Sequence, residues 1–313
     1  MPETPDKSVC QPIADPTYTG DWLVQHSKHI GSSDAAAICG MSNRRQPYDI
    51  WSEKTGRTDG EEQNDYMRRG KAFEPVIADE YALTVDDRLT YPCPMYESLR
   101  WPFLASTPDA MVTQAKRGVE IKLAHWTQAM KLGEEGSDQI FPEWVIQVHL
   151  QMLVTGCETT DVYVCVSPHE YRLFRVEFNQ RLADGLLGRL TAFWELVQTD
   201  IPPDIDFGHA SAKAILDRVE IKGESIQLCS DDLVGSVATY KEYGKRITKL
   251  TKAREIHRLR LIAAMGTAET CELLAADGKP MHVLKRSQIE ASKVAYDRKA
   301  HKKLSISKPK GKR

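Results

Sequence analysis

Two carboxylates and one ammonium group lie close together in the segment STPDAMVTQAKRGVEIK, which runs from Ser106 to Lys122. Asp109 precedes the apolar run 110–112, and Glu120 lies within the run 119–121. If these two runs are neighbouring strands, Asp109 and Glu120 can direct their oxygens at one cation, and Lys122 shares a face with Glu120 because strand side chains alternate. A solvated pair of strands is the alternative interpretation.

A site of this kind would suit a hard cation and phosphate chemistry. Carboxylate oxygens without a nearby cluster of His or Cys favour Mg²⁺, with Mn²⁺ as an alternative, and such ions keep water molecules for a substrate phosphate. The ion would offset the charge that grows on the phosphoryl oxygens, and Lys122 would orient or deprotonate the attacking water.

Two further polar features accompany this segment. Glu74 lies in a stretch with helical spacing of apolar residues, where a surface carboxylate is the alternative interpretation. Gln147 and Gln151 are four residues apart on a helix with apolar residues at 145, 146, 148 and 150, and therefore share one side of it, where they could equally be amides of the core. Both features support a site only if the fold brings them to Asp109 and Glu120.

The elements that must position these groups are helices and strands in mixed order. Apolar spacing, N-caps, Pro in first turns and terminal Gly residues predict the helices, and β-prone runs predict the strands. We expect helices at 18–29, 32–40, 46–56, 64–83, 142–156 and 180–198, and strands near 91, 95–96, 103–104, 110–113, 119–123, 160–167 and 171–178. After a loose leader of about 18 residues, this order predicts an α/β fold with a mixed central sheet flanked by helices.

A second region follows Pro202 and Pro203, so we expect a first domain at 1–207 and a basic region at 208–313 with a mobile tail. The basic region should hold a long helix from Ser230 to Met265 and a hairpin that turns at 277–278.

The two regions differ in charge. Residues 1–208 hold 19 Lys and Arg against 32 Asp and Glu, whereas residues 209–313 hold 23 against 12. This excess predicts contacts with DNA phosphates, although a solvated lysine-rich helix is the alternative. The expected contacts are Lys241, Lys245, Arg246 and Lys249.

The composition excludes several other classes of protein. A chain of 313 residues that is 41% hydrophobic can bury a real core, and no apolar run approaches the roughly 20 residues of a membrane span. The polar N-terminal segment does not resemble a signal sequence, so we expect a cytoplasmic protein. The seven scattered Cys include no CxxC pair, which favours reduced thiols and argues against a zinc site or a cluster.

Five motifs together resemble one known family. GSSDAAAICG, RRGKAFEP, STPDAMV, VEIK and PEWVIQVHLQMLVTG occur in the order and at about the spacing of lambda-exonuclease-like (YqaJ-type) phage recombination nucleases. The resemblance covers about 22–197. It implies the restriction-endonuclease-like PD-(D/E)xK fold and a Mg²⁺-dependent exonuclease that degrades one strand of duplex DNA from 5′ ends. It also implies a homo-oligomeric ring, such as a trimer, and an annealing protein as partner.

The resemblance also implies roles for individual residues. Asp109 and Glu120 would bind the metal together with the Ile121 carbonyl, and Lys122 would be the catalytic lysine. The other implied positions are an acidic site residue at Glu74, the helix glutamine at Gln147, and phosphate-binding groups at Ser33 and Thr107.

One position departs from the family pattern. His26 stands where the family often has the arginine that holds the 5′ phosphate, and Lys28 follows two residues later. Because a histidine is only partly charged near neutral pH, we expect capture of the terminal phosphate to be weaker, pH-dependent or carried by Lys28.

Three functions therefore compete. The first is a DNA exonuclease that acts on duplex ends, expected in the cytoplasm of a bacterial host if the chain comes from a phage. The second is an endonuclease or helicase-associated nuclease of the same fold, although no Walker A loop is present in this chain. The third is a non-catalytic DNA-binding recombination partner, against which the intact Asp109, Glu120 and Lys122 argue.

Overall fold

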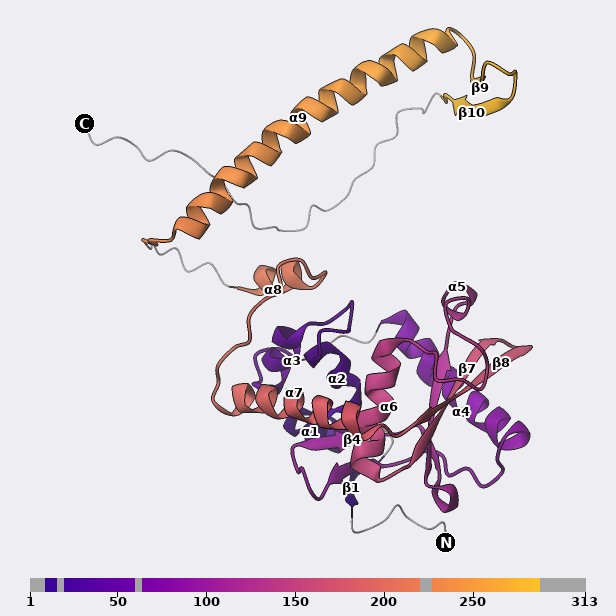
Figure 1. The fold of residues 1–313 in the computed structure, drawn as a ribbon, viewed down its shortest axis with the longest axis vertical. Coiled ribbons are helices and arrows are strands. Elements are labelled where there is room, and N and C mark those ends of the chain that lie inside the picture. Colours follow the sequence, from indigo (N-terminus) through magenta and orange to yellow (C-terminus); the bar gives the residue numbers. More distant parts are fainter. Residues whose placement is uncertain (1–8, 16–19, 60–63, 220–226, 288–313) are drawn as a thin grey trace. The chain divides into compact units, whose positions relative to one another are not determined.

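The computed structural model describes residues 9–15, 20–59, 64–219 and 227–287 (Figure 1). The chain divides into two compact units, Met1–Arg218 and Val219–Arg313, and each is described by itself. The predicted functional domains at 1–207 and 208–313 stay a prediction.

One sheet of the first unit has the strand order β1-β3-β4-β2. β1 pairs with β3 and β3 with β4 in antiparallel fashion, whereas β2 and β4 are parallel. The strands are β1 (Cys10–Ala14), β2 (Ile30–Gly31), β3 (Met95–Ser98) and β4 (Leu104–Ser106). The prediction of a loose leader is therefore wrong at 10–14, because this segment gains the backbone hydrogen bonds of a strand by pairing with distant residues.

The second sheet carries the predicted carboxylate segment and has the order β5-β6-β7-β8. β5 and β6 are antiparallel, β6 and β7 are parallel, and β7 and β8 are antiparallel. The strands are β5 (Ala110–Val112), β6 (Arg117–Leu123), β7 (Thr159–Ser167) and β8 (Glu170–Glu177). This mixed sheet with flanking helices confirms the predicted fold class.

Helices cover the two faces of this sheet, as Figure 1 shows for α4 and α6. Val119 and Ile121 of β6 pack in a cluster with Ile77 and Tyr81 of α4 (Asp65–Thr84). Because strand side chains alternate, Glu120 and Lys122 project to the opposite face, toward α6 (Pro142–Thr155).

The sequence fixes both ends of α6. Pro142 lies in its first turn, where the missing amide hydrogen costs nothing, and Gly156 ends it with a φ of 74°, a left-handed conformation that favours glycine. The helix contacts β3, β4, α2 and α7 as well as β6 and β7, so it links both sheets. The remaining helices of the first unit are α1 (Gly20–Lys28), α2 (Ser32–Ile38), α3 (Pro47–Lys54), η1 (Thr113–Ala115), α5 (Trp126–Ala129), α7 (Gln180–Gln198) and α8 (Ala212–Arg218).

The second unit holds the predicted long helix and hairpin. Ser230 caps α9 (Asp231–Met265) by accepting a hydrogen bond from the Leu233 amide, and strands β9 (Thr270–Leu274) and β10 (Pro280–Lys285) are antiparallel. Every residue of α9 from 231 to 261 is exposed. Among the described residues, no helix is both long and apolar enough to cross a bilayer, and the expected tail lies largely outside them.

Candidate active site

Asp109 lies immediately before β5, on the sheet edge next to β6. Its Oδ2 accepts a hydrogen bond of 2.7 Å from the backbone amide of Ile121. This bond draws the Asp109 carboxylate to the middle of β6, where Glu120 and Lys122 flank Ile121. The predicted proximity of Asp109 and Glu120 therefore follows from the pairing of β5 with β6.

Glu120 is almost completely buried, with 2% of the residue exposed. Its Oε1 accepts hydrogen bonds from Lys122 Nζ at 2.5 Å and from Gln147 Nε2 at 2.6 Å. Its Oε2 accepts one from Gln151 Nε2 at 2.5 Å. A buried carboxylate is costly unless it is paired and hydrogen-bonded, so these three donors offset the cost of burying Glu120 inside the fold.

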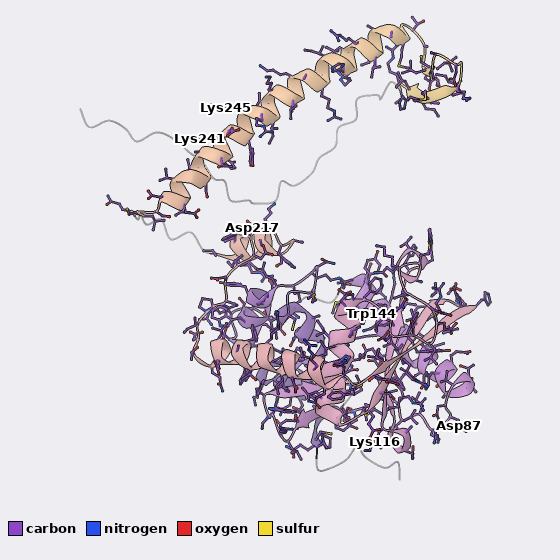
Figure 2. The ribbon with its side chains drawn as sticks, viewed as in Figure 1. Asp87, Lys116, Trp144, Asp217, Lys241 and Lys245 are labelled. Carbon is purple, nitrogen blue, oxygen red and sulfur yellow. The ribbon has the colours of Figure 1, made fainter. Side chains whose placement is uncertain are left out.

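Two of these three donors come from α6, because its glutamines Gln147 and Gln151 lie one turn apart on the side that faces β6. Gln147 also accepts a hydrogen bond from Lys122 Nζ at 3.0 Å, so Glu120, Lys122 and Gln147 form a closed triangle. Trp144, labelled on α6 in Figure 2, places its ring 5.7 Å from Lys122 Nζ. In the sequence only the spacing from Gln147 marks Gln151, and the structure shows it as a donor to Glu120.

Glu74 reaches the same site from α4. Its Oε1 accepts a hydrogen bond of 3.4 Å from the Tyr91 hydroxyl. Burial raises the pKa of Glu74, and the charge of Glu120 raises it further. Glu74 therefore interacts electrostatically with the Glu120 carboxylate.

The carboxylates of the site repel one another. Burial raises the pKa of Asp109 well above its ordinary value, and the charges of Glu120 and Glu74 raise it further. Burial lowers the pKa of Lys122, but the charges of Glu120 and Asp109 outweigh this effect, so that the net pKa is raised. Lys122 is therefore an ammonium group at neutral pH, and the site has an excess of negative charge.

This excess fits a divalent cation. Among the described residues, no three His, Cys, Asp or Glu side chains are grouped so as to hold a metal by themselves. Two carboxylates supplemented by a backbone carbonyl and water suit Mg²⁺, which is commonly bound through one or two carboxylates. The structure places the Ile121 amide on Asp109, and a role for the Ile121 carbonyl stays a prediction.

A second polar cluster surrounds His26 and Asp34 in the first unit. Asp34 Oδ2 lies 2.8 Å from Lys54 Nζ and 3.7 Å from His26 Nε2, and both the Asp34 and Lys54 side chains are fully buried. Arg45 Nη1 lies 3.3 Å from Asp34 Oδ1, and the same guanidinium pairs with Glu53. His26 Nδ1 also lies 3.7 Å from Glu53 Oε1.

His26 is linked to Thr107 through Trp22. The His26 and Trp22 rings stack with centroids 4.7 Å apart, and Trp22 Nε1 donates a hydrogen bond of 3.2 Å to Thr107 Oγ1. Burial is the largest influence on His26 and lowers its pKa from 6.5, outweighing the opposing effect of Asp34. His26 is therefore mainly neutral at physiological pH.

The other predicted phosphate-binding residues are exposed. Ser33 lies in the first turn of α2, and Lys28 is the last residue of α1. Lys241, Lys245, Arg246 and Lys249 belong to the second unit, so the structure does not relate them to Asp109. Arg45, Lys54 and Asp34 are not predicted from the sequence, because they are separated in the chain and meet only in the fold.

Comparisons with known proteins agree with the predicted family resemblance. Residues 21–158 match the YqaJ-like viral recombinase domain, which confirms that resemblance. The uncharacterized protein YqaJ of Bacillus subtilis (strain 168) is 25% identical over 177 residues, which are 56% of this chain and 54% of that protein. The match thus spans about half the length of this relative.

The fold also has a counterpart among solved structures. The crystal structure of an alkaline exonuclease (LHK-Exo) from Laribacter hongkongensis superposes with a TM-score of 0.50 at 22% identity. The superposition covers 58% of this chain and 94% of the other. This likeness supports the mixed α/β architecture.

The repulsion between Asp109 and its neighbouring carboxylates should lower the stability of the folded protein, and a bound metal ion should raise it. Because its folded-state pKa is raised, ionisation of Asp109 destabilises the metal-free protein as the pH rises above 3.8. We therefore expect Asp109→Asn to raise the melting temperature at neutral pH without metal. Mg²⁺ or Mn²⁺ at a hundredfold excess over its Kd should stabilise the wild type by about 2.7 kcal/mol. This corresponds to a rise of about 5–10 °C.

Differential scanning fluorimetry with divalent ion or EDTA measures both effects. Asp184→Asn, a change of the same type on the exposed side of α7, serves as the control and should behave like the wild type. If the ion stabilises the Asp109→Asn protein as strongly as the wild type, then Asp109 is not a metal ligand.

Proposed function

Because residues 21–158 match a YqaJ-like viral recombinase domain, we propose that this protein is a Mg²⁺-dependent DNA exonuclease. It would degrade one strand of linear duplex DNA from the 5′ end during phage-type recombination. The observation that carries the proposal is the triangle of Glu120, Lys122 and Gln147 beside Asp109. A solvated pair of surface strands would have no reason to bury Glu120.

The residues of the site suit hydrolysis of a phosphodiester. A divalent ion held by Asp109 and Glu120 would offset the charge that develops on the phosphoryl oxygens. The raised pKa of Lys122 keeps it protonated, so this supports a role in orienting the attacking water and stabilising charge rather than in removing a proton. Gln147 positions Lys122 and Glu120 relative to each other, and Glu74, whose pKa is raised, can hold a proton beside them.

The DNA end would lie at the cluster that includes His26 and Thr107, near the exposed Ser33. Hydroxyl groups and backbone amides of a helix N-terminus are suitable donors to phosphate. From the family resemblance we further expect a ring-shaped homo-oligomer such as a trimer, a single-strand annealing partner, and action in the cytoplasm of a bacterial host.

Two other functions give different results in one assay. An endonuclease of the same fold would nick circular duplex DNA, and a non-catalytic recombination partner would bind DNA without cleaving it. The exonuclease proposed here should degrade only linear duplex DNA, with Mg²⁺ and not with EDTA.

Substitutions in the site test the assignment of roles. Asp109→Ala, Glu120→Ala and Lys122→Ala should each reduce the rate of linear DNA digestion below one tenth of the wild-type rate, a loss of at least about 1.4 kcal/mol of transition-state stabilisation. Glu74→Ala and Gln147→Ala should cause smaller losses because these residues position others. Asp184→Ala is the matched control, and circular dichroism verifies folding. If a folded Asp109, Glu120 or Lys122 variant keeps more than a tenth of the wild-type digestion rate, the role assigned to that residue is wrong.

The charge of His26 should make the preference for 5′-phosphorylated over 5′-hydroxyl DNA ends depend on pH. Because burial lowers its pKa below 6.5, His26 gains positive charge only as the pH falls. We expect the ratio of cleavage rates for 5′-phosphorylated and 5′-hydroxyl ends to rise as the pH falls from about 8 to about 5.

His26→Arg is the control because arginine is charged throughout this range. The variant should keep a high ratio at every pH and thereby separate His26 from titration of the phosphate itself. An identical pH profile for the variant and the wild type would contradict the role of His26.

A further inference from the structure

Four lysines of α9 form a continuous stripe. Lys241, Lys245, Lys249 and Lys252 follow one another at intervals of four, four and three residues, which places them on one side of a helix. All four are exposed, and Figure 2 labels Lys241 and Lys245 on neighbouring turns. We call these four residues the lysine stripe.

Nearby acidic residues are engaged elsewhere. Glu242 lies 3.9 Å from Arg246, and Glu255 lies 2.7 Å from Arg258, in pairs within the helix. Within the described residues the structure has no ion pair for any lysine of the stripe. Arg246 also lies over the Tyr243 ring, on a different side of the helix, so it is not part of the stripe.

The opposite side of α9 argues against a helix that lies on a membrane surface. Tyr240, Tyr243, Ile247 and Leu250 form an exposed apolar row, but Arg254 and Arg258 continue the same side. A helix at a membrane interface carries its charges on one face and apolar residues on the other. The lysine stripe, in contrast, consists of one type of side chain from Lys241 to Lys252.

We propose that the lysine stripe is a second DNA site, which binds the sugar-phosphate backbone of duplex DNA without regard to sequence. At 1.5 Å per residue the stripe extends about 16 Å, comparable to about five base pairs at 3.4 Å each. Lysine ammonium groups on flexible stems suit this role because they act as point charges that adapt to irregular phosphate positions. The choice of duplex DNA as ligand rests on the proposed function.

The lysine stripe would supply an electrostatic attraction for duplex DNA, which the net acidic first unit lacks. Residues 1–208 have 13 more acidic than basic residues, so duplex DNA beyond the metal site meets an acidic surface. A backbone contact on α9 would keep a long substrate bound between cleavage events.

The test compares two full-length variants with equal changes in charge. The first replaces Lys241, Lys245, Lys249 and Lys252 with Gln, a good helix former. The control replaces four basic residues of the same unit that lie outside the stripe with Gln: Arg254, Arg258, Lys279 and Lys285. Circular dichroism verifies that α9 is intact in both.

Affinity is measured by fluorescence anisotropy in EDTA at several salt concentrations. The ligands are a circular duplex, which offers no end, and a linear duplex of about 40 base pairs. Loss of four phosphate contacts should reduce the slope of log affinity against log salt by about 3.6. Raising the salt from about 50 to 200 mM should then weaken wild-type binding roughly 150-fold more than binding by the stripe variant.

We expect the stripe variant to show the smaller salt slope with both the circle and the linear duplex. The control variant should have a slope close to that of the wild type. An unchanged slope in the stripe variant, or an equal change in the control, would overturn the proposal. A stripe variant that loses binding to anionic lipid vesicles but keeps its DNA slope would overturn it as well. Because circular DNA has no end to digest, this outcome does not depend on whether the protein is an exonuclease.

Discussion

The buried carboxylate of Glu120 is the constraint on which the first unit depends. A charge held in a protein interior is stable only with well-placed donors, and breaking a buried pair by removing one partner typically costs several kcal/mol. Glu120 finds its donors on Lys122, Gln147 and Gln151. The need to satisfy this one side chain therefore fixes α6 against β6, and with it the position of the whole site.

The same constraint explains why the sheet has two different faces. Val119 and Ile121 bury apolar surface against α4, whereas Glu120 and Lys122 face the side of α6 that carries Gln147 and Gln151. Asp109 joins from β5 through the Ile121 amide. Burial first, and then the neighbouring carboxylates, raise the pKa values of Asp109 and Glu74. Protons or a divalent cation can relieve this repulsion.

Much of this arrangement was predictable because it follows from local periodicity. Strand alternation places Lys122 beside Glu120, helical spacing places Gln147 with Gln151, and the family motifs and fold class are confirmed. Strand pairing and ion pairs between residues that are distant in the chain were not predictable from local patterns. The strand at 10–14 includes Pro12 and depends on β3, and the cluster of Asp34 with Lys54 joins two helices that show no shared local pattern.

The central claim is that the α6 amides hold Glu120 as a metal ligand, and calorimetric titration of Mn²⁺ into Gln151→Met tests it most directly. Met keeps the helix and most of the side-chain volume but removes the donor to Glu120 Oε2. Partners that orient metal ligands typically contribute 10- to 100-fold in affinity, so the account predicts at least tenfold weaker binding. Gln128→Met, on the exposed surface of α5, should bind like the wild type. Equal Mn²⁺ affinity in a folded Gln151→Met protein would contradict the account.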